Sequence, residues 1–406
     1  MAGLKYWVWL SALTDVTAQR KLRLLEELGS PENIYYADEE ELTRCLQERL
    51  KPDCSLLQPH SLERAEEILT RCRQLDIQVM TIADAIYPDR LRNIYDAPIL
   101  LYYRGKLPIL EEEAAVAVVG TRDASPYGLD AAEKLGFGLA KHGAVVVSGL
   151  ARGIDSYAVR GALRAGGVTV GVLGGCIDRV YPKENKYLYA DVAATGVLIS
   201  EYPPGTEPIP RNFPVRNRII SGLTLATVVV EAPEKSGALI TAVTALEQGR
   251  DVFAVPGNID APNSRGCHQL IRDGAGIAVS SWDILSGYAG QFPNKLQDLR
   301  YEMPRTMGYQ QRAEQQEQKT VKSPPAAEEK APLPVIDLTR NTVGMTDDQI
   351  AIMRVLSDEM PLQADEIIEK TGIPARRAMS ALTVLEIEDY VQQSAGKHFI
   401  RTVAIV

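Results

Sequence analysis

Three arginines, two asparagines and one aromatic ring are concentrated in residues 211–223, which read Arg-Asn-Phe-Pro-Val-Arg-Asn-Arg-Ile-Ile-Ser-Gly-Leu. The guanidinium groups of Arg211, Arg216 and Arg218 are permanently charged, planar donors that match the oxygens of a phosphate. The ring of Phe213 offers a face on which an unstacked base could lie. The segment is therefore a candidate polyanion site, although a helix with ordinary surface charges is an equally simple interpretation.

Short runs of Val, Ile, Leu and Ala recur through the middle of the chain, and most are separated by enough residues for one helix. Such alternation predicts parallel strands joined by crossover helices. Because the runs are apolar throughout, helices should cover both faces of the sheet. We therefore predict an α/β fold with a doubly wound, mostly parallel sheet. The predicted strands are 116–119, 144–148, 168–173, 197–200, 225–231, 251–255 and 277–280.

The loops after these predicted strands combine glycine with nearby cations. Ligands of doubly wound sheets bind outside the carboxyl ends of the strands. Glycine lets backbone amides approach a ligand there, and a helix N-terminus favours negative charge. Gly120-Thr-Arg follows the first run, Ser148-Gly-Leu-Ala-Arg follows the second, and Lys183 comes after the third. Turn geometry explains each glycine alone, but their repetition beside cations favours phosphate binding.

The overall charge limits how nucleic acid could be bound. The chain of 406 residues has 44 Lys and Arg against 53 Asp and Glu, a net charge of −9. Residues 110–290 hold 16 basic and 19 acidic side chains, so the predicted sheet domain is not basic as a whole. Because nonspecific affinity for nucleic acid comes largely from neutralised phosphates, any such site must be a local track of loop arginines.

Metal, cofactor and membrane functions have little support in the sequence. The 5 cysteines form no CxxC pair and the 4 histidines are scattered, which favours reduced thiols and argues against a metal site. No apolar stretch approaches the roughly 20 residues that a membrane helix needs, so we predict no span. The start, Met-Ala-Gly-Leu-Lys-Tyr-Trp, lacks the pattern of a signal peptide, and we expect a cytoplasmic protein without a bound cofactor.

Composition divides the chain into four parts. Residues 1–80 carry leucine-rich helical periodicity and predict a small helical domain. Residues 81–288 hold the predicted sheet. Residues 289–343 are rich in Gln, Glu, Lys and Pro, which predicts a flexible linker. Residues 344–406 form a fourth part with its own helical periodicity.

The fourth part has the element order of a winged helix. A capping-box pattern at Thr346 and Gln349 starts one helix, two more are predicted at 363–370 and 375–388, and two short strands follow. In duplex-binding relatives of this shape the last helix enters the major groove. Residues 346–406, however, hold 6 basic and 10 acidic side chains. We therefore favour a protein contact or a regulatory role over duplex binding.

Five motifs occur in a fixed order within residues 82–290. They are Val119-Gly-Thr-Arg122, Ser148-Gly-Leu-Ala-Arg-Gly-Ile-Asp155, Gly174-Gly with Tyr181-Pro-Lys-Glu-Asn185, Phe213-Pro-Val-Arg-Asn-Arg-Ile-Ile-Ser-Gly222, and Glu234-Lys-Ser-Gly-Ala238. In one α/β frame this set is specific, and the chain resembles the DNA-processing protein A family, DprA, also called Smf. The resemblance implies an extended Rossmann-like sheet, an N-terminal domain of SAM or helix-hairpin-helix type, and a C-terminal winged helix.

The resemblance also implies a function. Members of this family bind single-stranded DNA, protect it, and load the RecA recombinase on it during natural transformation and recombination. A homodimer is expected, and a binding protein rather than an enzyme. Tyr127 and Tyr181 are further candidates for stacking on bases. The implied DNA-binding residues are Gly120, Thr121, Arg122, Ser148, Gly149, Arg152, Lys183, Asn212, Phe213, Arg216, Asn217 and Arg218.

Two departures from the family pattern are visible. Thr121 stands where many relatives have serine, and it keeps the hydroxyl. Many relatives carry a glycine-bearing helical hairpin near the N-terminus, whereas Asp15-Val-Thr-Ala18 has no glycine to let the backbone reach a phosphate. For residues 1–80 we therefore expect packing or a partner contact rather than contact with DNA.

Two enzyme classes are alternatives. A nicotinamide-dependent oxidoreductase fits poorly, because the next glycine after Gly120 is Gly128 and the GxGxxG fingerprint is absent. A nucleotide-binding phosphoribohydrolase of the lysine-decarboxylase-like superfamily is the better alternative. Its Pro-Gly-Gly-x-Gly-Thr-x-x-Glu motif would lie near 233–244, where this chain lacks the catalytic carboxylate. The remaining candidates for acid or base chemistry could equally cap a helix or hold an arginine; they are Asp155, Asp178, Glu201 and Glu231.

Overall fold

The computed structural model describes residues 3–299, 335–336, 344–358, 361–388, 390–394 and 398–405. The chain divides into two compact units, Met1–Thr306 and Met307–Val406. Most of the predicted linker, 289–343, lies outside the described residues. Within the described ranges, no helix is both long enough and apolar enough to cross a bilayer.

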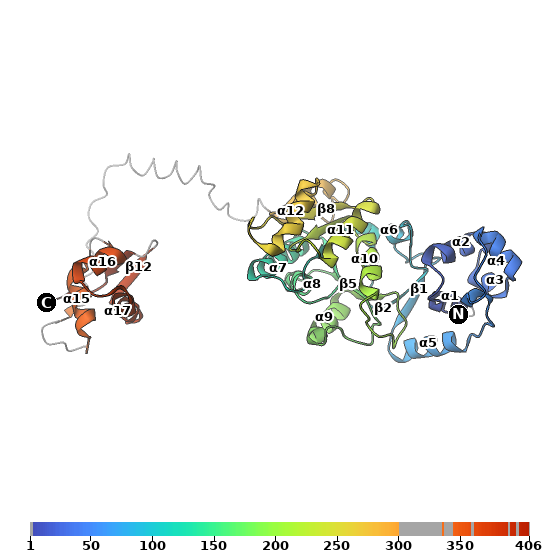
Figure 1. The fold of residues 1–406 in the computed structure, drawn as a ribbon, viewed down its shortest axis with the longest axis horizontal. Coiled ribbons are helices and arrows are strands. Elements are labelled where there is room, and N and C mark those ends of the chain that lie inside the picture. Colours follow the sequence, from blue (N-terminus) through green and yellow to red (C-terminus); the bar gives the residue numbers. More distant parts are fainter. Residues whose placement is uncertain are drawn as a thin grey trace. The chain divides into compact units, whose positions relative to one another are not determined.

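Nine strands of the first unit form one sheet in the order β1-β2-β6-β5-β4-β3-β7-β8-β9 (Figure 1). Neighbours from β6 to β9 are parallel, whereas β2 is antiparallel to both β1 and β6. The predicted mostly parallel sheet is therefore confirmed. The strands are β1 (Gln78–Thr81), β2 (Leu100–Gly105), β3 (Ala115–Val119), β4 (Val145–Ser148), β5 (Thr169–Leu173), β6 (Val197–Ser200), β7 (Ala226–Val229), β8 (Asp251–Ala254) and β9 (Gly276–Ile277).

Helices cover both faces of the sheet, as the wholly apolar strands require. Along β3, Val116 and Val118 point into one core while Ala117 and Val119 point into the other. The first core is closed by α7 (Pro126–Lys141), α8 (Ile154–Arg164), α9 (Lys186–Thr195) and α13 (Ser281–Leu285). The second is closed by α6 (Asp89–Arg92), α10 (Asn212–Gly222), α11 (Gly237–Glu247) and α12 (Arg265–Arg272).

Two glycines allow α7 and α8 to pack closely. A Cβ atom on Gly136 would lie 1.9 Å from the carbonyl oxygen of Ala158, and one on Gly161 would lie 2.1 Å from that of Glu133. Any larger side chain would force the helices apart. This contact fixes both helices, and with them the loops that precede them at the carboxyl edge of the sheet.

The winding of the chain changes direction at the centre of the sheet. From β3 the chain proceeds through β4 and β5 to β6, and α10 then returns it to β7 on the other side of β3. The carboxyl ends of β3 and β7 therefore diverge into loops that lead to opposite faces. Such a topological switch point is where doubly wound sheets place their ligands.

The N-terminal helices belong to the same packed unit. They are α1 (Leu4–Ala12), α2 (Ala18–Leu28), α3 (Pro31–Tyr36), α4 (Glu39–Leu46) and α5 (Glu63–Gln74). Thr17 caps α2 and Gly29 ends it at φ 75°. One hydrophobic core runs from Leu24 in α2 through Tyr102 in β2 to Leu188 in α9. Helical residues and sheet thus share a core.

Short 3₁₀ turns and a C-terminal extension complete the first unit. Phe292 and Leu296 are buried in the core that α13 closes, so packing continues beyond residue 288. The turns are η1 (Ser55–Leu57), η2 (Leu110–Glu112), η3 (Lys183–Asn185), η4 (Pro262–Ser264) and η5 (Ser286–Tyr288).

The second unit is a winged helix, as predicted. Its helices are α15 (Asp347–Val355), α16 (Ala364–Thr371) and α17 (Ala375–Ile387), and Thr346 forms the predicted capping box with Gln349. The strands β12 (Val391–Ser394), β13 (His398–Arg401) and β11 (Leu362–Gln363) form one small sheet, while β10 (Val335–Ile336) pairs in parallel with β14 (Ala404–Ile405). Arg377 of α17 donates to both carboxylate oxygens of Asp348 at 2.9 and 2.8 Å, so its charge is already paired.

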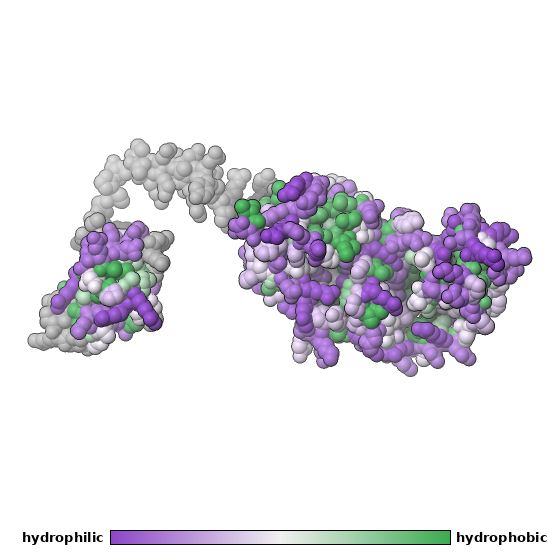
Figure 2. All heavy atoms as spheres, viewed as in Figure 1, coloured by the Kyte–Doolittle hydropathy of each residue, from purple (hydrophilic) through white to green (hydrophobic). Residues whose placement is uncertain are grey.

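An apolar patch lies on the outer face of α11. Figure 2 shows it as a hydrophobic area on the otherwise mostly hydrophilic first unit. Ile240, Val243 and Leu246 contribute to it and are 49%, 51% and 58% exposed. Neighbouring apolar side chains of this kind on a helix face are typical of a contact with another protein.

Candidate nucleic-acid interface

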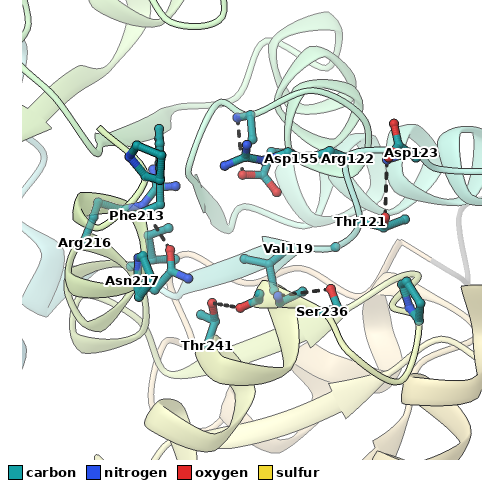
Figure 3. Close-up of a pocket in the computed structure, with 18 of the residues that line it drawn as sticks. Val119, Thr121, Arg122, Asp123, Asp155, Phe213, Arg216, Asn217, Ser236 and Thr241 are labelled. Carbon is teal, nitrogen blue, oxygen red and sulfur yellow. Dashed lines mark hydrogen bonds between the residues drawn. The ribbon is translucent and has the colours of Figure 1, made fainter. Parts of the chain in front are cut away.

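A cavity of about 540 Å³ opens at the switch point, beside the carboxyl end of β3. Figure 3 shows its walls. Thr121, Arg122 and Asp123 follow β3, and Phe213 and Asn217 come from α10. Ser236 comes from the loop between β7 and α11, and Thr241 comes from α11 itself. The structure therefore brings the predicted Gly-Thr-Arg loop and the predicted arginine-rich segment to one site, although residues 123–210 lie between them in the chain.

The loop after β3 is held tightly to its neighbours. A Cβ on Gly120 would lie 2.4 Å from Ile154 Cγ1, so only glycine fits there. The amide of Thr121 donates to the carbonyl oxygen of Glu231 at 2.7 Å, and its Oγ1 accepts from the amide of Asp123 at 3.3 Å. These contacts fix the backbone and leave the side chain of Arg122 exposed at the rim.

Aromatic and cationic groups meet around Phe213, whose ring is half-buried. The guanidinium carbon of Arg122 lies 4.9 Å from the centre of the ring, and that of Arg216 lies 6.0 Å from it. The ring of Tyr181, which is 42% exposed, is centred 5.5 Å from Phe213 at an angle of 37°. Tyr181 therefore lines the cavity beside Phe213, and its stacking on a base stays a prediction. Tyr127 lines no part of this cavity, and its hydroxyl donates to Pro256 O at 2.7 Å.

The loop after β4 corrects one expectation. The sequence suggested that strand-exit amides would be free to bind phosphate. Instead the amides of Gly149 and Ala151 donate to Oδ2 of Asp155 at 3.1 and 3.4 Å. Ser148 is fully buried and donates its hydroxyl to Val118 O at 2.7 Å. These two amides hold the loop itself, so they are not free to bind a phosphate.

Asp155 is the internal anchor of that loop. It lies in the first turn of α8 and is buried. Burial raises the pKa of its carboxyl group, and the positive charge of Arg216 and the two bonded amides oppose that shift. A buried carboxylate with these partners stabilises the loop geometry.

Arg216 forms the floor of the cavity rather than its rim. It is only 4% exposed, and its Nη1 donates to the carbonyl oxygens of Gly149, at 2.9 Å, and Val172. Its Nε donates to Oδ1 of Asn217 at 3.1 Å, which orients that amide at the cavity wall. Arg216 therefore contributes positive potential from below while its hydrogen bonds are made inside the protein.

Arg218 and Asn212 do not line the cavity. Nη2 of Arg218 donates to both carboxylate oxygens of Glu201 at 2.8 and 2.9 Å, and its Nε pairs with Asp96 at 3.1 Å. Two carboxylates thus neutralise this side chain, which is 8% exposed. Asn212 is also buried. The structure gives both residues a place in the support of α10 rather than on a basic surface.

A second hollow of about 460 Å³ adjoins the first, and Arg122, Tyr181 and Phe213 line both. Arg152 and Lys183 lie in this second hollow. Arg152 pairs with Glu184, and both side chains are exposed.

The support of Lys183 comes from the next turn. Lys183 begins η3 and is exposed. Asn185, two residues further on, is buried and donates to Leu150 O at 2.9 Å and to Ser156 Oγ at 2.8 Å. These bonds tie the segment that carries Lys183 to the loop after β4.

Lys235 is a site residue that the sequence reasoning did not include. It is exposed, lines the first cavity, and precedes Ser236, whose Oγ caps α11 by accepting from the amide of Ala238 at 3.3 Å. The signal was present, because the motif around Lys235 is another glycine-bearing strand exit with a cation. On α11 the cavity is lined by Gly237, Ala238 and Thr241, and no carboxylate of that helix takes part.

The other carboxylates considered for acid or base chemistry also have structural partners. Glu231 is buried and accepts from the amide and hydroxyl of Ser125 at 2.8 and 2.6 Å at the start of α7. Asp178 accepts from Arg71, and Glu201 from Arg218. Within the described part of the chain, His, Cys, Asp and Glu form no cluster of three that could hold a metal ion.

Comparison with known proteins agrees with this geometry. The family model of DNA recombination-mediator protein A matches residues 78–289, and that of the DprA winged helix domain matches residues 322–397. DNA processing protein DprA of Streptococcus pneumoniae is 47% identical over 208 residues, covering 51% of this chain and 73% of its own length. Protein Smf of Synechocystis sp. is 36% identical over 340 residues, covering 82% and 83%.

A solved structure agrees as well. The X-ray structure of DprA from Streptococcus pneumoniae superposes with a TM-score of 0.59 at 37% sequence identity, covering 70% of this chain and 97% of that one. The first family model alone spans more than half of the chain. It includes every strand of the nine-stranded sheet and every loop of the site. The motifs, the sheet with its switch-point cavity and the winged helix therefore place this chain in the DNA recombination-mediator protein A family, DprA/Smf.

Proposed function

We propose that this chain binds single-stranded DNA across the two adjoining hollows, protects the strand, and loads RecA on it. The phosphates would lie along Arg122, Lys183 and Lys235, with Arg152 beside them. One base would lie against the exposed side of the Phe213 and Tyr181 pair. Family membership and the names of the relatives, which describe DNA processing and recombination mediation, support a role on DNA.

The distribution of unpaired cations is the observation that carries this proposal. Arg122, Lys183 and Lys235 are exposed, and none of them forms an ion pair with another described residue. Arg218, by contrast, has two carboxylate partners. In a chain of net charge −9, three unneutralised cations in the lining of two adjoining hollows make a local anion site.

The shape of the site favours a single strand over a duplex. Phe213 is half-buried between two hollows, so a base can reach its ring only after leaving the stack of a duplex. Aromatic stacking is worth on the order of 1–3 kcal/mol per base and is sequence tolerant, since every base has a π-face. We therefore expect little sequence preference.

Fluorescence anisotropy with a labelled oligothymidine tests the proposal. Three phosphate contacts predict a slope of about −2 for the logarithm of the binding constant against the logarithm of salt. An unlabelled single strand should compete, and a duplex with the same number of nucleotides should compete poorly. No binding at low salt, or equal competition by the duplex, would contradict the proposal.

We infer a binding protein and not an enzyme. The carboxylates of Asp155, Glu201 and Glu231 hold amides or an arginine, and the wall from α11 carries no carboxylate. Incubation of the purified chain with mononucleotides should leave them intact. Release of a free base would instead favour the phosphoribohydrolase alternative.

The RecA contact, the homodimer and the cytoplasmic location are proposals that rest on the family. The exposed apolar face of α11 supports association with another protein. Light scattering of the full chain should give twice the monomer mass. RecA should hydrolyse ATP faster on a strand first covered by this protein, and an unchanged rate would count against loading.

A further inference from the structure

Two loops at the carboxyl edge of the sheet are joined by one carboxylate. Asp178 follows β5, and its Oδ1 accepts from the amide of Gly205 in the loop after β6 at 3.0 Å. Its Oδ2 accepts from Nη2 of Arg71, which lies on α5 of the N-terminal helices, at 2.7 Å. The Asp178 side chain is 8% exposed and that of Arg71 is 49% exposed. A residue from the N-terminal helices thus holds the acceptor that fixes the loop after β6.

That loop leads directly into the proposed DNA site. Pro208 lies in the cavity wall and packs closely on Gly175. A Cβ added to Gly175 would lie 3.0 Å from the Cβ of Pro208. The amide of Phe213 then donates to Pro210 O at 3.3 Å as α10 begins. The position of the Phe213 ring therefore depends on how the preceding loop is held.

A second point of support comes from α2. Lys21 is buried, and its Nζ donates to Ser11 O at 3.0 Å. Burial lowers the pKa of Lys21 to about 8, and the negative charge of Glu201 opposes that shift. Glu201 is the residue that binds Arg218 of α10 through both carboxylate oxygens. The charge of Lys21 on α2 therefore acts electrostatically on the carboxylate that holds Arg218 of α10.

We propose that the N-terminal helical domain positions the DNA site, with Arg71 as a positioning residue that acts through Asp178 and Gly205 on the loop before α10. This inference rests on the proposed function for its effect on DNA, but not for its effect on the loop. It gives residues 1–80 a role in DNA binding without contact with DNA.

The matched pair Arg71→Ala and Arg73→Ala tests the proposal in the full chain. Arg73 lies on the same helix, but among the described residues its guanidinium donates only to its own helix, to Leu69 O at 3.3 Å and Thr70 Oγ1 at 3.1 Å. Arg71→Ala should weaken oligothymidine binding about two- to five-fold, the range expected for a partly exposed ion pair. Arg73→Ala should bind as the natural chain does.

The salt slope separates positioning from direct contact. If Arg71 only positions the loop, its removal should leave the slope unchanged. A direct phosphate contact would lower the slope by roughly 0.7 and would overturn the proposal. Asp178→Asn keeps an acceptor for Gly205 but removes the charge that holds Arg71. It should weaken binding like Arg71→Ala, and the double variant should lose little more.

Hydrogen exchange without DNA makes the test independent of the proposed function. Arg71→Ala should speed exchange of the Gly205 amide, whereas Arg73→Ala should not. If exchange is faster in Arg71→Ala but the natural chain binds no oligothymidine, Arg71 still positions the loop and the proposed DNA function is wrong. If the natural chain binds oligothymidine and Arg71→Ala changes neither the exchange of the Gly205 amide nor the affinity, the positioning role is refuted.

Discussion

Removal of two unpaired cations gives the sharpest test of the proposed site. Arg122 and Lys183 lie in the same hollow, are exposed, and have no ion-pair partner among the described residues. Arg122→Gln combined with Lys183→Gln should remove two phosphate contacts. Each contact accounts for roughly 0.7 of the slope of log affinity against log salt, so the slope should fall by about 1.4.

The same slope fixes how the loss of affinity depends on salt. With two contacts removed, binding should weaken about 25-fold at about 0.1 M salt and only about 5-fold at about 0.3 M salt. The slope is a cleaner measure than affinity at one salt concentration. Arg122 also lies over the Phe213 ring, and the loss of that contact, worth about 0.5–1 kcal/mol at exposed sites, makes the ring easier for a base to reach.

Anisotropy titrations of labelled oligothymidine at several salt concentrations provide the assay. Arg272→Gln is the matched control, because Arg272 is exposed on α12, bonds to Gln269 of its own helix at 3.3 Å, and lines neither hollow. Circular dichroism should show that both variants are folded. If the double variant keeps the slope of the natural chain, the strand does not follow Arg122 and Lys183, and the reasoning fails.

Three further predictions concern stacking, pH and packing. Phe213→Ala should weaken oligothymidine binding by about 1–3 kcal/mol with an unaltered salt slope, and a changed slope at equal affinity would contradict stacking. Because burial lowers the pKa of Lys21 to about 8 from 10.5, the folded chain binds fewer protons than the unfolded chain between these values. The free energy of unfolding should therefore rise between about pH 8 and pH 10.5, by at most about 3 kcal/mol relative to Lys21→Met. Urea unfolding followed by tryptophan fluorescence measures this difference. Parallel pH profiles of the two proteins would refute the prediction. Gly136→Ala should cost at least about 1–3 kcal/mol of stability, because its Cβ would strike Ala158 O, whereas Gly287→Ala, with open space around it, should be nearly neutral in thermal unfolding.

Local patterns predicted most of the fold because they report local physics. The apolar run 116–119 became β3, and Thr17 and Gly29 bounded α2 as capping rules require. The first two strands were missed. The run that begins at Leu100 is apolar and forms β2. Its partners, β1 and β6, lie far from each other in the chain. The sequence gives no periodic signal for a strand that pairs with both.

The site was harder to predict because the sequence does not show which groups a charged side chain or a backbone amide binds. The sequence shows that Arg216 and Arg218 are arginines, but not that they donate to the carbonyl of Gly149 and the carboxylate of Glu201. The same holds for the amide of Gly149, which binds Asp155. Lys235 was missed for the opposite reason: its motif was recognised, but nothing local shows that the loop after β7 faces the loop after β3.

The contact between Arg122 and Phe213 has a consequence for the lifetime of a complex. The guanidinium of Arg122 already lies over the Phe213 ring. A base that arrives must therefore displace this cation or stack on the part of the ring that it leaves uncovered. The gain from stacking is therefore reduced by the cation–π attraction that is given up. On departure of the base, Arg122 can return and cover the ring again. If this chain binds single-stranded DNA as proposed, a strand held in this way should dissociate faster than one held by an unoccupied ring.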